Sequence, residues 1–272
     1  MLTAGIDMGA KTIKVVILDD GKIRAQSLLL TGRDKEKLAE QVFDEALKKA
    51  KLSRKDIKNI VATGIGRKRI PFANDSITMP SADVKGTLYF FPSVRTILDV
   101  GAEEGRAIKC DEKGTVKDFA TNEKCAAGAG TFVEVTARTL EVKLEEMGEL
   151  SLKSTQKVDM NAQCAVFAES ELVSLIHRKL PKVDIIHSVH DAVSGRIESL
   201  ARTIEVVKDI ALIGGVAKNA GFVDCLKKRL EVDIKIPENP EFVGALGAAI
   251  IAATGTTAAD REVVGKVIAK PD

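Results

Sequence analysis

Two segments of the chain place an aspartate and a glycine at the end of a short apolar run. The first is Asp7-Met8-Gly9-Ala10-Lys11 and the second is Asp99-Val100-Gly101-Ala102-Glu103. Glycine at such a junction lets backbone N–H groups approach an oxygen-rich ligand with no Cβ in the way. Phosphate would repel the two carboxylates directly, so we interpret Asp7 and Asp99 as oxygen ligands of Mg²⁺, usually through water. The pattern predicts a site for phosphate and magnesium.

The two segments also repeat one another. Residues 7–16 align without gaps on residues 99–108, an offset of 92 residues. In both copies a second apolar run follows the glycine, which predicts a β-hairpin with an aspartate at its mouth. Asp-Gly turns are common, so coincidence is the alternative, but two ungapped copies favour two similar lobes that present their hairpins to a shared cleft. Lys11, Lys14 and Arg106 are candidates for contacting phosphate; the alternative for Lys14 and Arg106 is a solvated strand position, which we favour for Lys14.

A third apolar run, Ile210–Ile213, ends in Gly214-Gly215 and leads into a helical pattern after Lys218. A strand, a glycine pair and a helix in this order let a flat base or a ribose lie against bare backbone, near the positive end of the helix dipole. The segment is not a G-x-G-x-x-G fingerprint, and the chain contains no Walker P-loop. Coming after two Asp-x-Gly hairpins, it predicts the base-binding part of a nucleotide site.

The elements that must position these turns alternate along the chain. Lys35–Leu52 and Asp191–Val207 have the apolar spacing of amphipathic helices, and they lie between the strand-like runs. This alternation predicts an α/β fold. We expect an N-terminal lobe over residues 1–92 and a C-terminal lobe over residues 93–272, with the C-terminal helix able to pack back on the first lobe. The tail beyond Thr254 is predicted to be weakly held.

Composition narrows the class of protein. The chain has 272 residues, of which 45% are apolar, and a net charge of +2. Near-balanced charge argues against a nucleic-acid-binding protein, and no apolar run approaches the roughly 20 residues that span a bilayer. Asp7 and Lys11 interrupt any signal-peptide core at the N-terminus. We therefore expect a cytoplasmic protein with no nucleic-acid or membrane partner.

Two of the four cysteines each come directly before a helical pattern. They are Cys125, in a segment that continues through Gly128 and Gly130, and Cys164. A helix N-terminus stabilises a thiolate and an anionic cluster bound to it, whereas the alternative role, which position alone favours, is that of a small buried hydrophobe. Two thiolates fall short of the four that a 4Fe–4S cluster needs, but two chains meeting at a two-fold axis would supply four.

The other cysteines and the histidines give weaker signals. Cys110 and Cys225 lie in or beside apolar patterns, so we expect structural roles for both. The three histidines are expected to be surface helix residues and not a metal site; they are His177, His187 and His190.

The ordered set of two Asp-x-Gly hairpins and a Gly-Gly turn resembles the actin, sugar-kinase and heat-shock-chaperone ATPase superfamily. The resemblance implies two ribonuclease-H-like lobes around a nucleotide cleft that binds ATP and Mg²⁺. It places Asp7 and Gly9 in the first phosphate motif, Asp99 and Gly101 in the second, and Gly214 and Gly215 in the adenosine motif. Neighbouring residues carried into the nucleotide site on the same basis are Ala10, Lys11, Ala102, Gly128, Gly130 and Lys218.

The cysteine segments narrow the resemblance to one family within that superfamily. K-C-A-A-G-x-G around Cys125 and C-x-V-F-A-E-S-E from Cys164 look like segments of the ATP-dependent activators of 2-hydroxyacyl-CoA dehydratases and the ATP-binding subunits of benzoyl-CoA reductase, the BadF/BadG/BcrA/BcrD type of ATPase. The family implies one 4Fe–4S cluster per dimer, shared with a second copy or a related subunit. It also implies an electron donor such as ferredoxin or flavodoxin, and an iron–sulfur acyl-CoA reductase or dehydratase as partner.

One departure from the family bears on function. Its dehydratase activators usually read G-G-Q-D after the second aspartate, where this chain reads Gly101-Ala102-Glu103-Glu104. The difference favours a reductase-type subunit or a divergent activator, and it leaves the roles of the two glutamates open. We place Glu103 with Asp7 and Asp99 as a candidate catalytic residue.

The resemblance implies an ATPase that uses ATP to pass low-potential electrons to an enzyme acting on a CoA thioester. A metabolite kinase of the same fold is one alternative; it would need an acceptor pocket, usually built by inserted loops, and the chain is short. A nucleotide-binding regulatory or assembly protein is the other, and it would leave the paired cysteines unexplained.

Overall fold

A computed structural model describes residues 1–122, 130–160, 165–263 and 266–268. The chain divides into two compact units. The first contains Met1–Ile97, Cys110–Asp118 and Pro237–Val264, and the second contains Leu98–Lys109, Phe119–Ile236 and the last strand of the chain. No helix among the described residues is long and apolar enough to cross a membrane.

The first unit is built on a five-stranded sheet in the order β3-β2-β1-β4-β5. Strands β1, β2 and β3 pair antiparallel, while β4 and β5 continue the sheet in parallel pairing. The bounds are β1 (Leu2–Met8), β2 (Thr12–Asp19), β3 (Lys22–Leu30), β4 (Asn59–Thr63) and β5 (Asp75–Ser76). The first Asp-x-Gly segment is therefore the turn of a hairpin, as its sequence predicts.

Helices cover both faces of this sheet, because its central strands are apolar on both sides. Ala4, Ile6 and Met8 of β1 pack with the buried face of α1 (Lys35–Ala50). On the other face, Val16 and Leu18 of β2 pack with α8 (Val243–Thr254). Helix α8 also lies against α2 (Met79–Phe90). A segment near the end of the chain thus completes the core of the first unit.

The prediction of a weakly held tail is wrong for the described residues. Helix α9 (Ala258–Arg261) begins with a capping box between Thr257 and Asp260. Arg261 donates to Asp75 at 2.6 Å, and the carbonyl of Asp260 accepts a hydrogen bond from Thr78 N. Further on, β11 (Lys266–Ile268) pairs in parallel with β8. The tail is held by residues from much earlier in the chain, and the sequence of the tail itself does not indicate these contacts.

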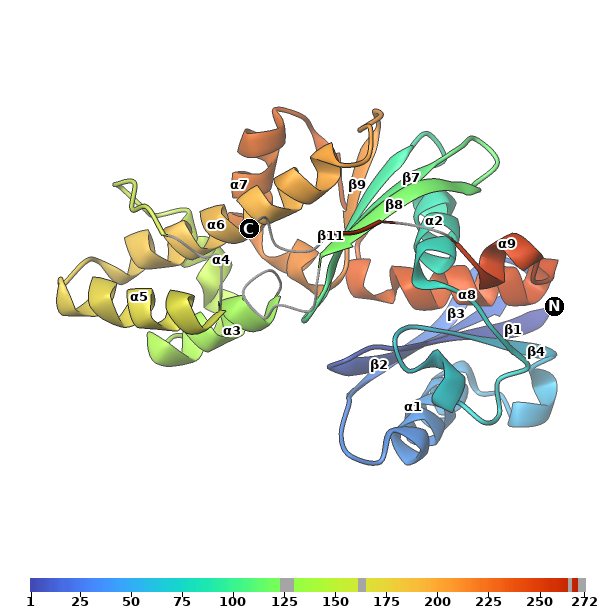
Figure 1. The fold of residues 1–272 in the computed structure, drawn as a ribbon. Coiled ribbons are helices and arrows are strands. Elements are labelled where there is room, and N and C mark those ends of the chain that lie inside the picture. The colour runs from blue at the N-terminus through green and yellow to red at the C-terminus, as the bar shows by residue number, and fades with distance from the viewer. Residues whose placement is uncertain (123–129, 161–164, 264–265, 269–272) are drawn as a thin grey trace. The chain divides into compact units, whose positions relative to one another are not determined.

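The second unit contains most of a six-stranded sheet in the order β10-β9-β6-β7-β8-β11. Its other strands are β6 (Thr96–Val100), β7 (Gly105–Cys110), β8 (Val116–Asn122), β9 (Ile210–Ile213) and β10 (Ile234–Lys235). The helices of this unit are α3 (Gly130–Thr139), α4 (Met147–Ser151), α5 (Ala165–His177), α6 (Lys182–Arg202) and α7 (Ala220–Leu230). Figure 1 shows the element order, and the alternation confirms the predicted α/β class.

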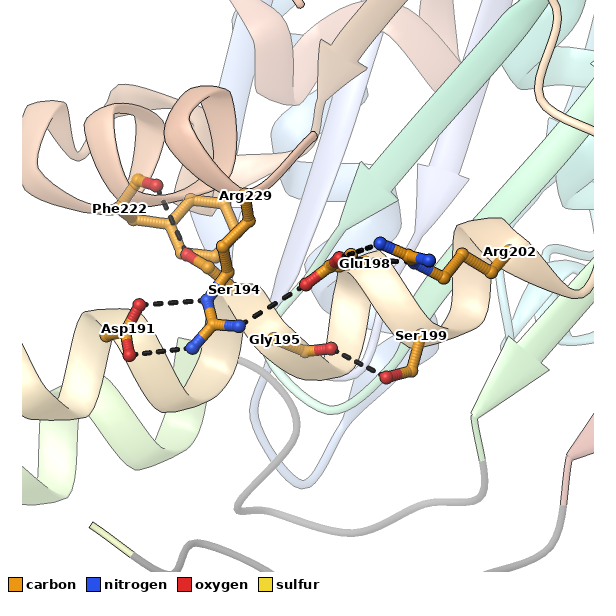
Figure 2. A network of polar contacts seen from close by, with 8 residues as sticks. All are labelled: Asp191, Ser194, Gly195, Glu198, Ser199, Arg202, Phe222 and Arg229. Atoms are coloured by element: carbon orange, nitrogen blue, oxygen red, sulfur yellow. Dashed lines mark hydrogen bonds and ion pairs between the residues drawn. The ribbon is translucent and has the colours of Figure 1, made fainter. Parts of the chain in front are cut away.

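A charged network joins α6 to α7. Arg229 of α7 donates two hydrogen bonds to Asp191, at 2.8 and 2.6 Å, and a third at 3.3 Å to Glu198 (Figure 2). Nearby, Ser194 Oγ donates to the carbonyl of Phe222 at 3.3 Å. A bidentate arginine fixes orientation as well as distance. Helix α6, which begins nine residues before the predicted Asp191 start, therefore sets the position of α7 and of the turn that leads into it.

Candidate functional site

The first hairpin holds Asp7 opposite a lysine. In the register of β1 and β2, Asp7 pairs with Lys14, and Lys14 Nζ donates to Asp7 Oδ2 at 2.9 Å. Both side chains are largely buried, with exposed fractions of 16% for Asp7 and 14% for Lys14. The favoured expectation that Lys14 is a solvated strand residue is therefore wrong. Its β-strand partner is a carboxylate, and burying either charge alone would be costly.

Backbone hydrogen bonds fix the turn that follows Asp7. Gly9 N donates to the carbonyl of Thr12 at 3.0 Å, which closes the hairpin. Thr31, just after β3, braces it by donating from its N–H to the Lys11 carbonyl at 2.7 Å and from its hydroxyl to the Gly9 carbonyl at 3.3 Å. Ala10 is half-buried and Lys11 is exposed at the tip of the turn.

The second hairpin repeats this arrangement in the second unit. Arg106, seven residues after Asp99 as Lys14 is after Asp7, donates to Asp99 Oδ2 and, at 3.1 Å, to Glu104. Gly101 N donates to the Glu104 carbonyl at 2.9 Å, the counterpart of the Gly9 bond in the first hairpin. Glu103, predicted to be catalytic, is exposed at the tip of this turn. The sequence repeat thus corresponds to a repeated local geometry.

A glycine directly after the neighbouring strand lies against each aspartate. Gly64 follows β4 with φ +92°, and a Cβ there would overlap Oδ1 of Asp7. Gly214 follows β9 with φ +88°, and a Cβ there would overlap Oδ1 of Asp99. Each carboxylate therefore presents one oxygen to a cation and the other to bare backbone. Only glycine combines a positive φ with this close approach.

Gly64 is a site residue that the sequence patterns did not indicate. Its sequence position could have indicated it, because Gly64, like Gly214, directly follows a buried strand of four or five residues. Asp83 of α2 was missed as well. It is 5% exposed, and a Cβ at Gly244 would stand 3.2 Å from Asp83 Oδ1 and 3.8 Å from Asp7 Oδ2. The first unit thus places a second carboxylate near Asp7, which no local pattern indicates.

The second hairpin is bonded to the start of helix α3. Gly130 N donates to the Gly101 carbonyl at 2.9 Å, and Thr131 N donates to the Ala102 carbonyl at 2.9 Å. The Thr131 hydroxyl donates to the same Ala102 carbonyl at 2.7 Å. The structure thus brings together three predicted site residues, Gly101, Ala102 and Gly130. Cys125 and Gly128, in the segment directly before α3, lie outside the described residues, as does Cys164 before α5.

The Gly-Gly turn leads through a 3-10 turn (Gly215–Lys218) into α7. A Cβ at Gly215 would meet no described atom within 4 Å, so the space in front of this residue is open. Lys218 is exposed. Asn219 caps α7, with its Oδ1 accepting a hydrogen bond from Phe222 N at 3.0 Å. The turn is therefore accessible at Gly215 and anchored at Asn219.

The other two cysteines, Cys110 and Cys225, are both buried, as expected for structural residues. Cys110 is 3% exposed and Cys225 is 2% exposed. Burial raises the pKa of Cys110 to about 11 and that of Cys225 to about 12, so both remain thiols at neutral pH. Within the part of the chain that the structure describes, no three His, Cys, Asp or Glu residues are grouped so as to hold a metal ion.

The expectation that all three histidines lie at the surface is wrong for His190. His177 is exposed and His187 is half-buried, but His190 is 0% exposed. His190 Nε2 lies 3.0 Å from Asn219 Nδ2, and burial lowers the pKa of His190 to about 3. It occupies the buried face of α6 because α4 and α7 both pack on that helix.

Comparison with known proteins identifies the family. The chain matches the model of the BadF/BadG/BcrA/BcrD ATPase family over residues 4–252. It is 41% identical to the activator of lactoyl-CoA dehydratase from Anaerotignum propionicum, over 93% of this chain and 97% of that protein. It is 30% identical to a benzoyl-CoA reductase subunit from Thauera aromatica, over 92% of each.

A solved structure supports the same assignment. The activator of 2-hydroxyisocaproyl-CoA dehydratase from Clostridium difficile, with bound ADPNP, superposes with a TM-score of 0.88 at 36% identity, over 93% of this chain and 94% of that one. The predicted resemblance and the predicted actin-like ATPase fold are both confirmed. The chain belongs to the BadF/BadG/BcrA/BcrD family of ATPases.

Proposed function

We propose that this ATPase activates a 2-hydroxyacyl-CoA dehydratase by passing it single low-potential electrons through an iron–sulfur cluster. The greater identity to the lactoyl-CoA dehydratase activator, 41% against 30% for the benzoyl-CoA reductase subunit, supports a dehydratase partner. The departure at Ala102 and Glu103 favours a reductase-type subunit or a divergent activator, and a divergent activator agrees with this higher identity. The cluster, the dimer that shares it and a ferredoxin or flavodoxin donor are parts of this proposal.

We propose that ATP binds at the two hairpins and the Gly-Gly turn. The backbone at Gly9, Ala10 and Lys11 and the backbone at Gly101 and Ala102 would contact phosphate. Gly214, Gly215 and Lys218 would contact the nucleoside. Asp7 and Asp99 fit a hydrated Mg²⁺ through Oδ1, which faces bare glycine backbone, while Oδ2 of each accepts a hydrogen bond from Lys14 or Arg106. Mg²⁺ would neutralise phosphate charge during transfer to water.

Cys125 and Cys164 are the proposed cluster ligands, two from each chain of a dimer. The other two cysteines do not suit a cluster shared between two chains, because both are buried inside the fold, at 3% exposure for Cys110 and 2% for Cys225. A 4Fe–4S cluster would supply one-electron chemistry. The segments holding Cys125 and Cys164 come directly before α3 and α5 in the sequence.

The observation that carries the proposal is the hydrogen bonding between the second hairpin and α3. Three bonds of 2.7–2.9 Å join the Gly101 and Ala102 carbonyls to Gly130 and Thr131. Movement of the proposed phosphate-binding turn would therefore move the first turn of α3. Helix α3 begins at Gly130, five residues after Cys125 in the sequence. We propose that a change at the nucleotide reaches the cluster through this connection.

The test is the rate at which a chelator removes iron from the anaerobic protein with ADP or ADPNP bound. We expect rates that differ severalfold between the two nucleotides. Thr131→Val removes one bond to the turn and should shrink that difference while leaving nucleotide affinity unchanged. Thr139→Val is the matched control, because the hydrogen bond that the structure gives the Thr139 hydroxyl runs to the carbonyl four residues earlier in α3 and not to the turn. Equal rates with both nucleotides in the wild type would contradict nucleotide coupling.

A second prediction concerns the open space at Gly215. Gly215→Val should fold normally, since a Cβ there meets no described atom within 4 Å. It should nevertheless weaken ADP binding about 10- to 100-fold, because the branched side chain would occupy the proposed nucleoside position. Isothermal titration gives the dissociation constant and thermal unfolding checks the fold. Wild-type affinity in a folded variant would remove Gly215 from the site.

A further inference from the structure

The buried side chain of His190 forms a hydrogen bond whose direction the structure fixes. Asn219 caps α7 with its Oδ1, which accepts from Phe222 N at 3.0 Å. Its amide nitrogen must then be the atom that faces His190 Nε2, at 3.0 Å. An amide nitrogen only donates, so Nε2 is the acceptor. The proton of the neutral imidazole therefore lies on Nδ1, which has no hydrogen-bond partner among the described atoms.

Backbone packs closely around the side chains of His190 and Asn219. A Cβ at Gly221 would stand 2.8 Å from His190 Nδ1, and a Cβ at Gly148 would stand 3.1 Å from Asn219 Oδ1. Backbone from α7 and α4 therefore lies directly against both side chains. Reversing the Asn219 amide would place its nitrogen against the Phe222 N–H and its oxygen against Nε2. The reversed amide would thus break the cap.

The same asparagine ends the turn proposed to hold the nucleoside. Asn219 directly follows Gly215–Lys218, and its own N–H donates to the carbonyl of Val216 at 2.9 Å. Fixing the Asn219 side chain therefore fixes the backbone of the turn and the first turn of α7 together. His190 lies on α6, so the acceptor that holds Asn219 comes from a different helix.

We propose that His190 is a positioning residue for nucleotide binding: as a neutral imidazole protonated on Nδ1, it holds the Asn219 amide and with it the Gly215–Lys218 turn. This proposal rests on the nucleotide site of the proposed function. It predicts that the acceptor at the Nε2 position is required, and not simply a polar side chain of similar size.

Two variants of His190 separate these requirements. His190→Gln places an amide oxygen near the Nε2 position, whereas His190→Asn reaches only the Nδ1 position. We expect His190→Asn to raise the dissociation constant for ADP about 10-fold, the cost of one lost buried hydrogen bond, and His190→Gln to stay near the wild type. At saturating ATP, kcat should change little in either variant, so the loss should appear in affinity. His187→Asn, one turn earlier on α6, is the matched control.

Histidine tautomers in the wild type give a readout that does not depend on variants folding. Long-range ¹H–¹⁵N spectra of protein labelled at histidine should show His190 neutral with the proton on Nδ1. A proton on Nε2, or equal ADP affinity in the folded Gln and Asn variants, would overturn the role of His190 while leaving the proposed function intact. Failure of the wild type to bind ADP would instead refute the nucleotide site, and the tautomer would still decide whether Nε2 is the acceptor.

Discussion

Asp7→Asn and Asp99→Asn should each lower kcat for ATP hydrolysis about 100-fold or more, with the dissociation constant for ADPNP changing by less than about fivefold. Each substitution replaces an oxygen anion proposed to hold hydrated Mg²⁺, but leaves the glycine turn that would contact the phosphates. The backbone bond from Gly9 to Thr12, and its counterpart from Gly101 to Glu104, does not involve either carboxylate. Catalysis should therefore fall much further than binding.

The buried cations require a control for stability. In Asp7→Asn, Lys14 keeps its charge at 14% exposure without its carboxylate, and an unpaired buried charge destabilises a fold. The double variant Asp7→Asn/Lys14→Met removes both charges and should recover thermal stability without recovering hydrolysis. Asp224→Asn, which changes a carboxylate paired on α7 with Lys228 at 2.7 Å, should leave both kcat and affinity unchanged. Equal losses of kcat and affinity in the aspartate variants would contradict the proposed magnesium role.

Cys125→Ser and Cys164→Ser should each remove essentially all iron from anaerobically purified protein. A four-thiolate cluster shared by two chains loses two ligands when one cysteine of each chain is changed. The variants should also dimerise more weakly, because the proposed cluster bridges the two chains. Nucleotide affinity should remain, because the hydrogen bonds that the structure gives the turn at Gly101 run to Glu104 and Gly130.

Cysteines elsewhere in the chain provide the matched controls. Cys110→Ser and Cys225→Ser should leave iron and acid-labile sulfide unchanged, because both thiols are buried and have raised pKa values. Iron and sulfide analysis, with the oligomeric state from sedimentation, decides the outcome. A full iron complement in Cys125→Ser or Cys164→Ser would show that the bridging ligand set is wrong.

Local sequence determined the parts of the candidate site that lie on single hairpins and turns. An apolar strand, an aspartate and a glycine specify a hairpin through alternation and turn chemistry that act within about ten residues. Asp7 and Gly9, and likewise Asp99 and Gly101, could therefore be found without a structure. Gly214 and Gly215 could be found for the same reason, as could the α/β class, because strand and helix patterns alternate along the chain.

Tertiary structure alone decided which residues support those turns. From the sequence, Lys14 and His190 were both predicted to lie at the surface. In the structure, strand register places Lys14 opposite Asp7, and α4 and α7 cover His190. The bond from Thr131 to Ala102 joins residues 29 apart in sequence. Such contacts depend on how whole helices and strands pack. The local sequence around one residue of a contact therefore does not identify the other residue. The sequence thus predicted where the candidate site lies, and packing determined which residues support its turns.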